Sequence, residues 1–597
     1  MIDLHDKKVL ARLHKAKKTS LNALVPFRQA RKELIRDHVG SWYSENSGAR
    51  METLVNLINQ TARIYTVALA ANNPRVMVTT PLTENWPFAK RFEVNLNKLI
   101  SDMNLDRTFR LCVLDAFFCV GCAVVMMRDT DTRFHGLTEA EEDVWLDPGE
   151  PWLNRVSLDS LILDMSAGEI SKMRFCGHRY RADFEKVKEE PGYDKKVQKE
   201  LTPTSKHSVD DADFAREIAS GGMVDDDELK PMLWMEDIWI PENNSVATFA
   251  VDFEHLPPLI EREWTGSQSG PYKFLSLGLV PDNIIPVSPA MNLKPLHDLQ
   301  NRLHRRMRDD SNAHRKVNIY PPGGEDDADT LRKAKRNDWI KMKDPKAVTQ
   351  AVLGGVDPAD QGFSLFVQEE YDRFAGNLRA MGGLGAQAGT LGQEEIVQGN
   401  VSRMEADMHL AVMGFAGECC YDLGKLMWND ESLRILSSAE AGNTGFYYDT
   451  SWEPGNRAGD FEDYDFRVEP YSMVYKTPKQ KLEELFQVLQ QIAPLWPMFQ
   501  ASGANLDAEA ILDEVARLTD RPELRKFITF NSPASMLGGD ENTVRQSPVT
   551  TRNTVRRNVP TGGTPEARNA IMQQVLGGAS RPQVNGQQAA AIGRSPA

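Results

Sequence analysis

Apolar positions recur with a helical period over several stretches of the N-terminal half. From Leu54 to Leu69 they return every three or four residues, and Asn72-Asn73-Pro74 then breaks the pattern. The same spacing predicts helices over about 88–100 and 105–120. Short apolar runs predict strands over 75–79 and 121–127, so helices and strands share the first part of the chain.

Between about 151 and 285 the pattern changes to strands. They are predicted over 156–163, 175–180, 233–240, 246–253 and 259–264. An acidic stretch of low hydrophobicity, about 195–230, interrupts them and is predicted to be a mobile insertion. Residues 1–290 are therefore predicted to form an N-terminal arm and an α+β body.

Two long helices are predicted next, at 294–316 and 358–383, and they should pair as a hairpin. Pro295 suits the first turn of the first helix, and Asp357 with Pro358 is a strong start for the second. The first helix has a narrow apolar stripe, with basic residues on its other faces: Arg302, Arg305, Arg306 and Arg308. The predicted stripe of the second is Phe363, Phe366, Val367, Phe374, Leu378 and Met381, and Gly382-Gly383 ends it.

Residues 317–357 are predicted to form a small module at the tip of this hairpin. A helix is predicted around 326–336, and 338–342 has the pattern of a strand. In a strand, Trp339 and Lys341 would point to one side and Ile340 to the other.

A flexible Gly-rich loop is predicted over 384–393. It contains no Lys or Arg, and its polar side chains are Gln387, Thr390 and Gln393. Thr390 and Gln393 match a capping box for a helix of about 30 residues that follows. Strands return before 475, amphipathic helices occupy much of 476–530, and 531–597 is predicted to be a largely disordered tail containing arginines.

Charge and composition limit the classes of function. The 597 residues include 70 Lys and Arg against 85 Asp and Glu, a net charge of −15, which argues against broad attraction to phosphate backbones. The basic segment from Lys7 to Arg36 is predicted to be a solvated helix face or a docking arm. Six cysteines suit a reducing compartment, and the lack of long apolar runs predicts a soluble protein made in the cytoplasm.

Motifs for known chemistry were sought without success. The sequence has no phosphate-binding P-loop, zinc-protease motif, nucleophile elbow or dinucleotide fingerprint. Cys119 and Cys122 form a C-x-x-C inside an apolar run and are interpreted as buried core, while His178 and His304 are interpreted as structural. No catalytic residue, cofactor site or metal site is predicted.

Taken in order, these features resemble the portal proteins of tailed bacteriophages. The resemblance spans most of the chain and lies in Ala71–Val78, Asp115–Gly121, Arg155–Asp164, the helical hairpin with its tip, the Gly-rich loop and the long helix. It implies a portal fold: wing (about 40–290 and 394–475, after the arm), stem helices (294–316 and 358–383), clip (317–357), channel loop (384–393), crown (476–530) and tail (531–597).

The resemblance also implies a non-enzymatic function. Portals form a ring, usually of twelve subunits, at one capsid vertex of the virion, and double-stranded DNA is packaged and ejected through it. The implied partners are the terminase large subunit, the major capsid and scaffold proteins, and tail or adaptor proteins, with no membrane. Gln387, Thr390 and Gln393 would then touch DNA, the four arginines would lie in the stem, and Trp339, Ile340 and Lys341 would form a clip interface.

Two other readings stay open at this point. One is a metal-dependent nucleic-acid-processing enzyme of the packaging machinery, although the sequence supplies no convincing carboxylate constellation. The other is a capsid or scaffold lattice protein, which the long central helices disfavour.

Overall fold

The computed structural model of the chain describes most of the first 494 residues. The described residues are 2–40, 54–128, 150–190, 192–203, 230–335, 338–342, 349–376, 378, 391–430, 433–440, 447–469, 472–473, 478–492, 494, 511 and 515. The chain divides into two units, 1–524 and 525–597, and every described residue belongs to the first. The predicted tail and most of the predicted crown lie outside the described residues.

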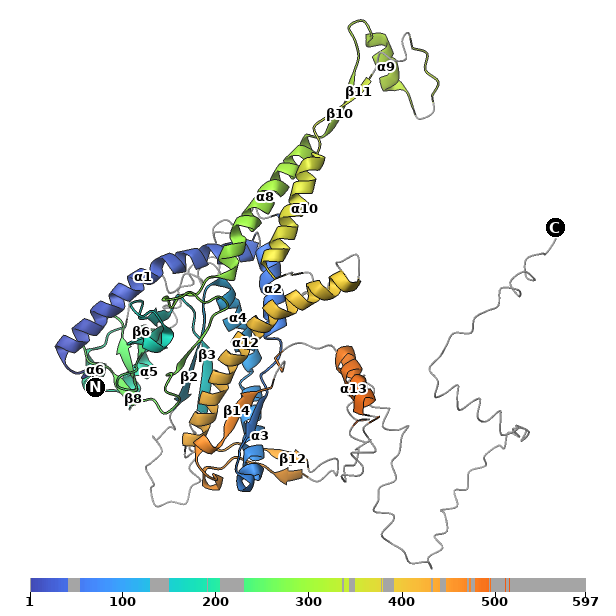
Figure 1. Ribbon diagram of the computed structural model, residues 1–597. Helices are drawn as coiled ribbons and strands as arrows, with labels where there is room; N and C mark the ends of the chain where they lie inside the picture. Colours follow the sequence, from blue (N-terminus) through green and yellow to red (C-terminus); the bar gives the residue numbers. More distant parts are fainter. Residues whose placement is uncertain are drawn as a thin grey trace, which may run out of the picture. The chain divides into compact units, whose positions relative to one another are not determined.

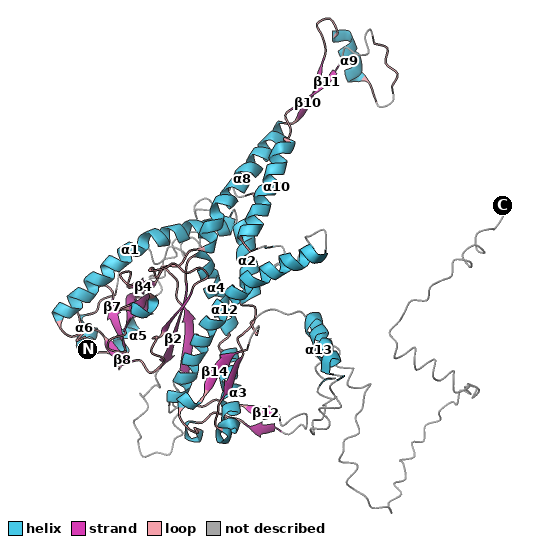
Figure 2. Ribbon diagram, viewed as in Figure 1, coloured by secondary structure: helices cyan, strands magenta, loops and turns pink. Residues whose placement is uncertain are grey.

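The chain contains both helices and strands (Figures 1 and 2). The helices are α1 (Lys7–Val39), α2 (Leu57–Leu69), α3 (Trp86–Asp102), α4 (Leu105–Phe118), α5 (Phe184–Glu189), α6 (Lys195–Glu200), α8 (Pro289–Ala313), α9 (Glu325–Lys333), α10 (Pro358–Phe374), α12 (Leu391–Asn429) and α13 (Pro478–Ile492). The strands are β1 (Val76–Thr79), β2 (Gly121–Arg128), β3 (Glu150–Arg155), β4 (Leu161–Leu163), β5 (Cys176–Asp183), β6 (Met232–Ile240), β7 (Ser245–Ala250), β8 (Ile260–Glu263), β9 (Tyr272–Leu275), β10 (Arg315–Ile319), β11 (Thr349–Leu353), β12 (Ser438–Glu440), β13 (Tyr447–Asp449) and β14 (Asp465–Val468).

The strands form antiparallel sheets. The largest has the order β4-β5-β6-β7-β8, and a second has the order β3-β2-β9. Three two-stranded ribbons pair β1 with β14, β10 with β11, and β12 with β13. The predicted α+β class is confirmed.

The main hydrophobic core lies where α2, α3 and α4 meet α12. Phe92 of α3 packs against Trp452 with ring centroids 4.8 Å apart, and Phe109 of α4 meets Phe415 of α12 at 5.6 Å. All four side chains are buried. The 39 residues of α12 extend about 58 Å at 1.5 Å per residue, long enough to contact β2, β9 and β14 in turn.

Several predicted strands and boundaries were wrong in detail. Of the strand predicted over 156–163, only Leu161–Leu163 is a strand, β4, because 156–160 are irregular and the preceding strand β3 ends at Arg155. Strand β9 was missed because it is only four residues long and contains Lys273, a buried cation. Within the predicted mobile insertion, Lys195–Glu200 forms helix α6, capped by Asp194, and 204–229 lie outside the described residues.

The hairpin helices also differ from their predicted limits. Helix α8 begins at Pro289, where Ser288 caps it by accepting from Met291 N at 3.1 Å, so Pro295 lies inside the helix rather than in its first turn. Helix α10 ends at Phe374 instead of continuing to 383, because Gly376 takes a positive φ of 82°. Helix α12 begins at Leu391, three residues earlier than predicted.

Candidate functional site

The helical hairpin of α8 and α10 is the part of the fold on which the predicted site residues depend. The two helices lie side by side, and the β10–β11 ribbon continues from their ends (Figure 1). Asp357 caps α10 by accepting from Ala359 N at 2.9 Å, as predicted. Gly355 N donates to Asp310 O at 3.2 Å, which closes the hairpin where the ribbon begins.

Two polar contacts join the helices. Gln300 of α8 donates to the Ser364 hydroxyl of α10 at 2.9 Å, and both side chains are buried. Farther along, Arg306 and Asp360 form an ion pair at 3.3 Å. A hydrogen bond and an ion pair therefore help to match the two helices to each other.

The large apolar side chains of α10 do not face α8, which corrects the predicted stripe. Phe363, Phe366 and Phe374 are 46%, 54% and 64% exposed, and Leu365 is 62% exposed. Val367 and Leu378 of the predicted stripe are buried, and Met381 lies outside the described residues. The rings of Phe363 and Phe366 stack on each other with centroids 6.4 Å apart, so α10 presents two stacked aromatic rings to solvent, and Phe374 is exposed farther along the helix.

The four arginines of α8 are distributed around the hairpin. Arg302 is exposed, Arg305 is half-buried and donates to Asn301 O at 3.3 Å, and Arg306 takes part in the pair with Asp360. Arg308 pairs with the adjacent Asp309 at 3.0 Å. The structure does not bring the four together into one basic site.

The tip is built differently from its prediction. Its two strands are β10 and β11, paired from Arg315 with Leu353 to Ile319 with Thr349, and α9 lies between them in sequence, close to the predicted helix. The strand predicted over 338–342 was wrong, since these residues are irregular. Trp339 is fully exposed, Lys341 is exposed and Ile340 is half-buried.

The predicted channel loop lies mostly outside the described residues, and so do Gln387 and Thr390. Gln393 is the third residue of α12, the position that a capping box requires, so it belongs to the helix and not to the loop.

The junction of α8 with α1 contains the residues best placed to hold a metal ion. Ligand atoms of Asp37, His297 and Asp298 lie within 4.8 Å of one another, and no second group of this kind occurs in the described part of the chain. However, Lys294 Nζ lies 2.5 Å from Asp37 and 3.8 Å from Asp298. Because an ammonium already sits between the carboxylates, the cluster is an ion-pair junction that ties α8 to α1.

The basic N-terminal segment is only partly a solvated face, which corrects its prediction. Lys17 pairs with Glu236, and Arg31 bridges Asp115 at 2.9 Å and Asp159 at 2.8 Å, all of them buried. Arg28 is also buried and donates to Leu161 O at 3.0 Å. These cations hold α1 against the sheets.

A buried polar network around Asp237 was not foreseen from the sequence. Thr248 and Tyr180 donate to its carboxylate at 2.7 and 3.2 Å, and His178 Nδ1 lies 2.8 Å from the Tyr272 hydroxyl. Burial raises the pKa of Asp237 and lowers that of His178. His178 thus sits in a hydrogen-bonded interior.

The cysteines lie in the protein interior, as interpreted from the sequence for Cys119 and Cys122. All six are free and buried, and burial raises the pKa of Cys119 to about 12. A thiol with such a pKa is neither nucleophilic nor a ready metal ligand at neutral pH.

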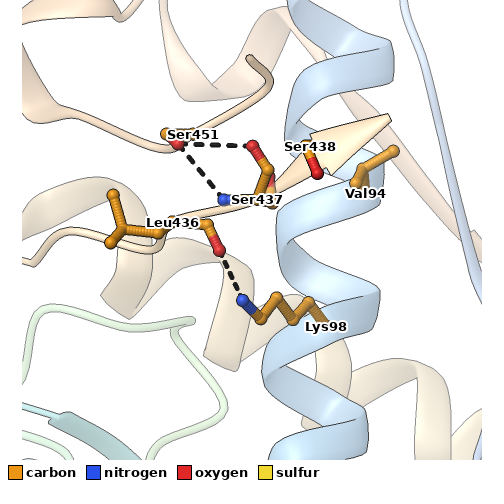
Figure 3. Close-up of a pocket in the computed structure, with 6 residues that line it drawn as sticks. All are labelled: Val94, Lys98, Leu436, Ser437, Ser438 and Ser451. Atoms are coloured by element: carbon orange, nitrogen blue, oxygen red, sulfur yellow. Dashed lines mark hydrogen bonds between the residues drawn. The ribbon is translucent and has the colours of Figure 1, made fainter. Parts of the chain in front are cut away.

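An open depression lies between α3 and β12 (Figure 3). Its walls are Val94, Lys98, Leu436, Ser437, Ser438 and Ser451. Lys98 donates to Leu436 O, and Ser451 exchanges hydrogen bonds with the Ser437 backbone at 3.2 and 3.3 Å. The polar groups satisfy one another, so the depression offers no evident chemistry.

Comparison with known proteins identifies no family for the chain, because neither a protein-family model nor a curated protein matches it. In the described part of the chain, no helix is long and apolar enough to cross a membrane.

Proposed function

We propose that the chain is a portal-type subunit that forms a ring-shaped channel for double-stranded DNA at one vertex of a phage capsid. The observation that carries the proposal is the exposed aromatic surface of α10. Phe363, Phe366 and Phe374 are each about half exposed or more, whereas Ser364 and Val367 of the same helix are buried. Monomeric proteins rarely expose such a surface without a partner, and copies of the same hairpin would cover it in a ring.

Charge on the hairpin supports contacts between copies. Helix α8 carries five cations and three carboxylates, whereas α10 carries four carboxylates and one cation. The two helices thus have opposite net charge, and α8 of one copy is complementary to α10 of the next.

The dimensions of such a ring suit DNA. Twelve helices side by side at roughly 10 Å spacing place their axes on a circle about 38 Å across, which leaves about 28 Å after one helix width is subtracted. That opening is wider than a B-form duplex. The net charge of −15 per subunit would let DNA slide instead of holding its phosphates.

The remaining parts of the proposal follow the resemblance. The tip (315–353) would be the clip on which the terminase large subunit docks, α8 and α10 the stem, and the body the wing that meets the major capsid and scaffold proteins. Tail or adaptor proteins would bind after packaging, and the mature location would be the virion. The proposed role is structural, not enzymatic.

Negative-stain microscopy of the purified full-length protein tests the proposal. A ring with a central hole is the expected result. Monomers that cleave DNA only when a divalent cation is added would instead favour the metal-dependent nucleic-acid-processing enzyme.

A further inference from the structure

The outer face of the first three turns of α1 carries five exposed cations. They are Lys7, Lys8, Arg12, Lys15 and Lys18, called here the α1 cationic face. At 1.5 Å and 100° per residue, they occupy about 17 Å of the helix axis and an arc of about 140°. They therefore form one continuous surface.

In the described part of the chain, no ion pair balances the charges on this face. No carboxylate occurs between Asp6 and Glu33, and within the described residues none of the five cations forms an ion pair. Like charges three and four residues apart destabilise a helix, and cations in its first turn oppose the helix dipole. Asp6, the N-cap, is the one carboxylate beside Lys7 and Lys8, and its side chain accepts from Lys8 N.

The face is not needed to hold α1 in place. The opposite side of the same turns is anchored by Leu10 and His14, which are buried, and by the Lys17–Glu236 pair. An unfavourable charge pattern on a helix that is secured from its other side points to an external anion.

We propose that the α1 cationic face docks an acidic helix of a partner protein, with carboxylates repeating every three or four residues. Lys8, Arg12, Lys15 and Lys18 recur at that same spacing, so two helices side by side would pair these four cations one to one. DNA fits less well, because the patch is short, contains no amide or aromatic side chain to read bases, and belongs to a chain of net charge −15 that repels a long polyanion. The inference does not depend on ring formation.

The test uses fluorescence anisotropy with the full-length protein and three labelled probes. One is a helical peptide of about 18 residues with Glu at positions i, i+4, i+7 and i+11. The second has the same composition with its Glu residues in one block, and the third is a DNA duplex of about 20 base pairs. The wild type should bind the spaced peptide at least about fivefold more tightly than the other two probes.

Variants assign the binding to the face. Replacing all five cations with Gln should weaken binding of the spaced peptide at least about tenfold without lowering the melting temperature. The matched control, with Arg63, Arg107, Lys195, Lys196 and Lys199 replaced by Gln, removes the same charge from exposed positions elsewhere and should keep wild-type affinity. If the variant with five substitutions has a lowered melting temperature, the double variant Lys15→Gln/Lys18→Gln replaces it. The double variant should also bind the spaced peptide more weakly than wild type, by a smaller factor.

Four outcomes would overturn the inference: no binding of the spaced peptide, equal affinity for both peptides, tighter binding of the duplex, or an equal loss in the control variant. Tighter duplex binding would identify a nucleic-acid surface instead.

Discussion

Gln300 on α8 donates a hydrogen bond to the hydroxyl of Ser364 on α10 across 2.9 Å, inside a hairpin whose phenylalanines face outward. Val367, three residues along α10 from Ser364, is also buried, so the inner side of this helix holds both polar and apolar side chains. The exposed phenylalanines lie outside that inner side. Large apolar side chains in such a position are expected where the surface is covered by another molecule.

Ser364→Ala should destabilise the protein by about 1–3 kcal/mol, because the buried Gln300 amide loses an acceptor. Denaturant unfolding measures the change. Ser311→Ala, an exposed serine at the far end of α8, is the matched control and should stay within about 0.5 kcal/mol of wild type. Equal effects at the two positions would show that the bond does not hold the hairpin.

A second buried contact joins β9 to α12. Lys273 Nζ lies 2.8 Å from Asp422, and the two side chains are 1% and 0% exposed. Lys273→Met should cost about 3–5 kcal/mol because it leaves a buried carboxylate unpaired, whereas adding Asp422→Leu should recover much of that loss. A double-mutant cycle by urea unfolding measures both, and a double variant no more stable than the single one would contradict the account.

Stability should depend on pH through buried histidines. Burial lowers the pKa of His178 below its ordinary value of 6.5, and the pKa of His14 and of His38 shifts the same way, also chiefly through burial. Well above pH 6.5 the histidines are neutral in both states. As pH falls through 6.5, the unfolded chain takes up protons that the folded chain does not, so stability is lost.

Melting temperatures between pH 8 and pH 5 test this, at roughly half-unit steps. His178→Gln should flatten part of the fall below pH 6.5, whereas the exposed His5→Gln should leave the profile unchanged. A profile identical in all three proteins would show that His178 does not contribute.

Trp339 should matter for binding and not for folding. Its side chain is fully exposed, so Trp339→Ser should change the free energy of unfolding by less than about 0.5 kcal/mol. Under the proposed function, the same variant should bind a terminase large subunit at least about tenfold more weakly, as expected for an aromatic anchor. Calorimetry measures the first quantity and surface plasmon resonance the second, and unchanged binding would remove Trp339 from the interface.

The sequence predicted elements where local signals and burial agree. Asp357-Pro358 marks the start of α10, and the short, mostly apolar run at 233–240 marks β6, because caps and apolar runs depend on neighbouring residues alone. Predictions from the sequence failed where contacts between distant parts of the chain decide whether a side chain is buried. Lys17 was taken as solvated because its partner Glu236 lies 219 residues away.

In the hairpin, too, the local sequence pattern did not show what a side chain contacts. The helical stripe that includes Phe363 and Phe366 was correctly seen as apolar, but periodicity cannot tell whether such a stripe faces its own chain or another molecule. A signal was available for α1, because buried residues recur along it every three or four positions. They are Leu10, His14, Lys17, Ser20, Leu24, Arg28, Arg31 and Leu34. The buried face of α1 could have been predicted if its lysines and arginines had been allowed as buried positions in the helical pattern.

The mass of the assembled particle tests the central claim most directly. Mass photometry of the full-length protein should show a closed particle of about 800 kDa, twelve copies of 67.1 kDa. Phe363→Ser/Phe366→Ser should shift the population toward single subunits, and Leu279→Ser, which alters an 84% exposed leucine outside the hairpin, should not. Wild-type protein that stays at the mass of one chain under all conditions, or rings that survive the double substitution unchanged, would contradict the account.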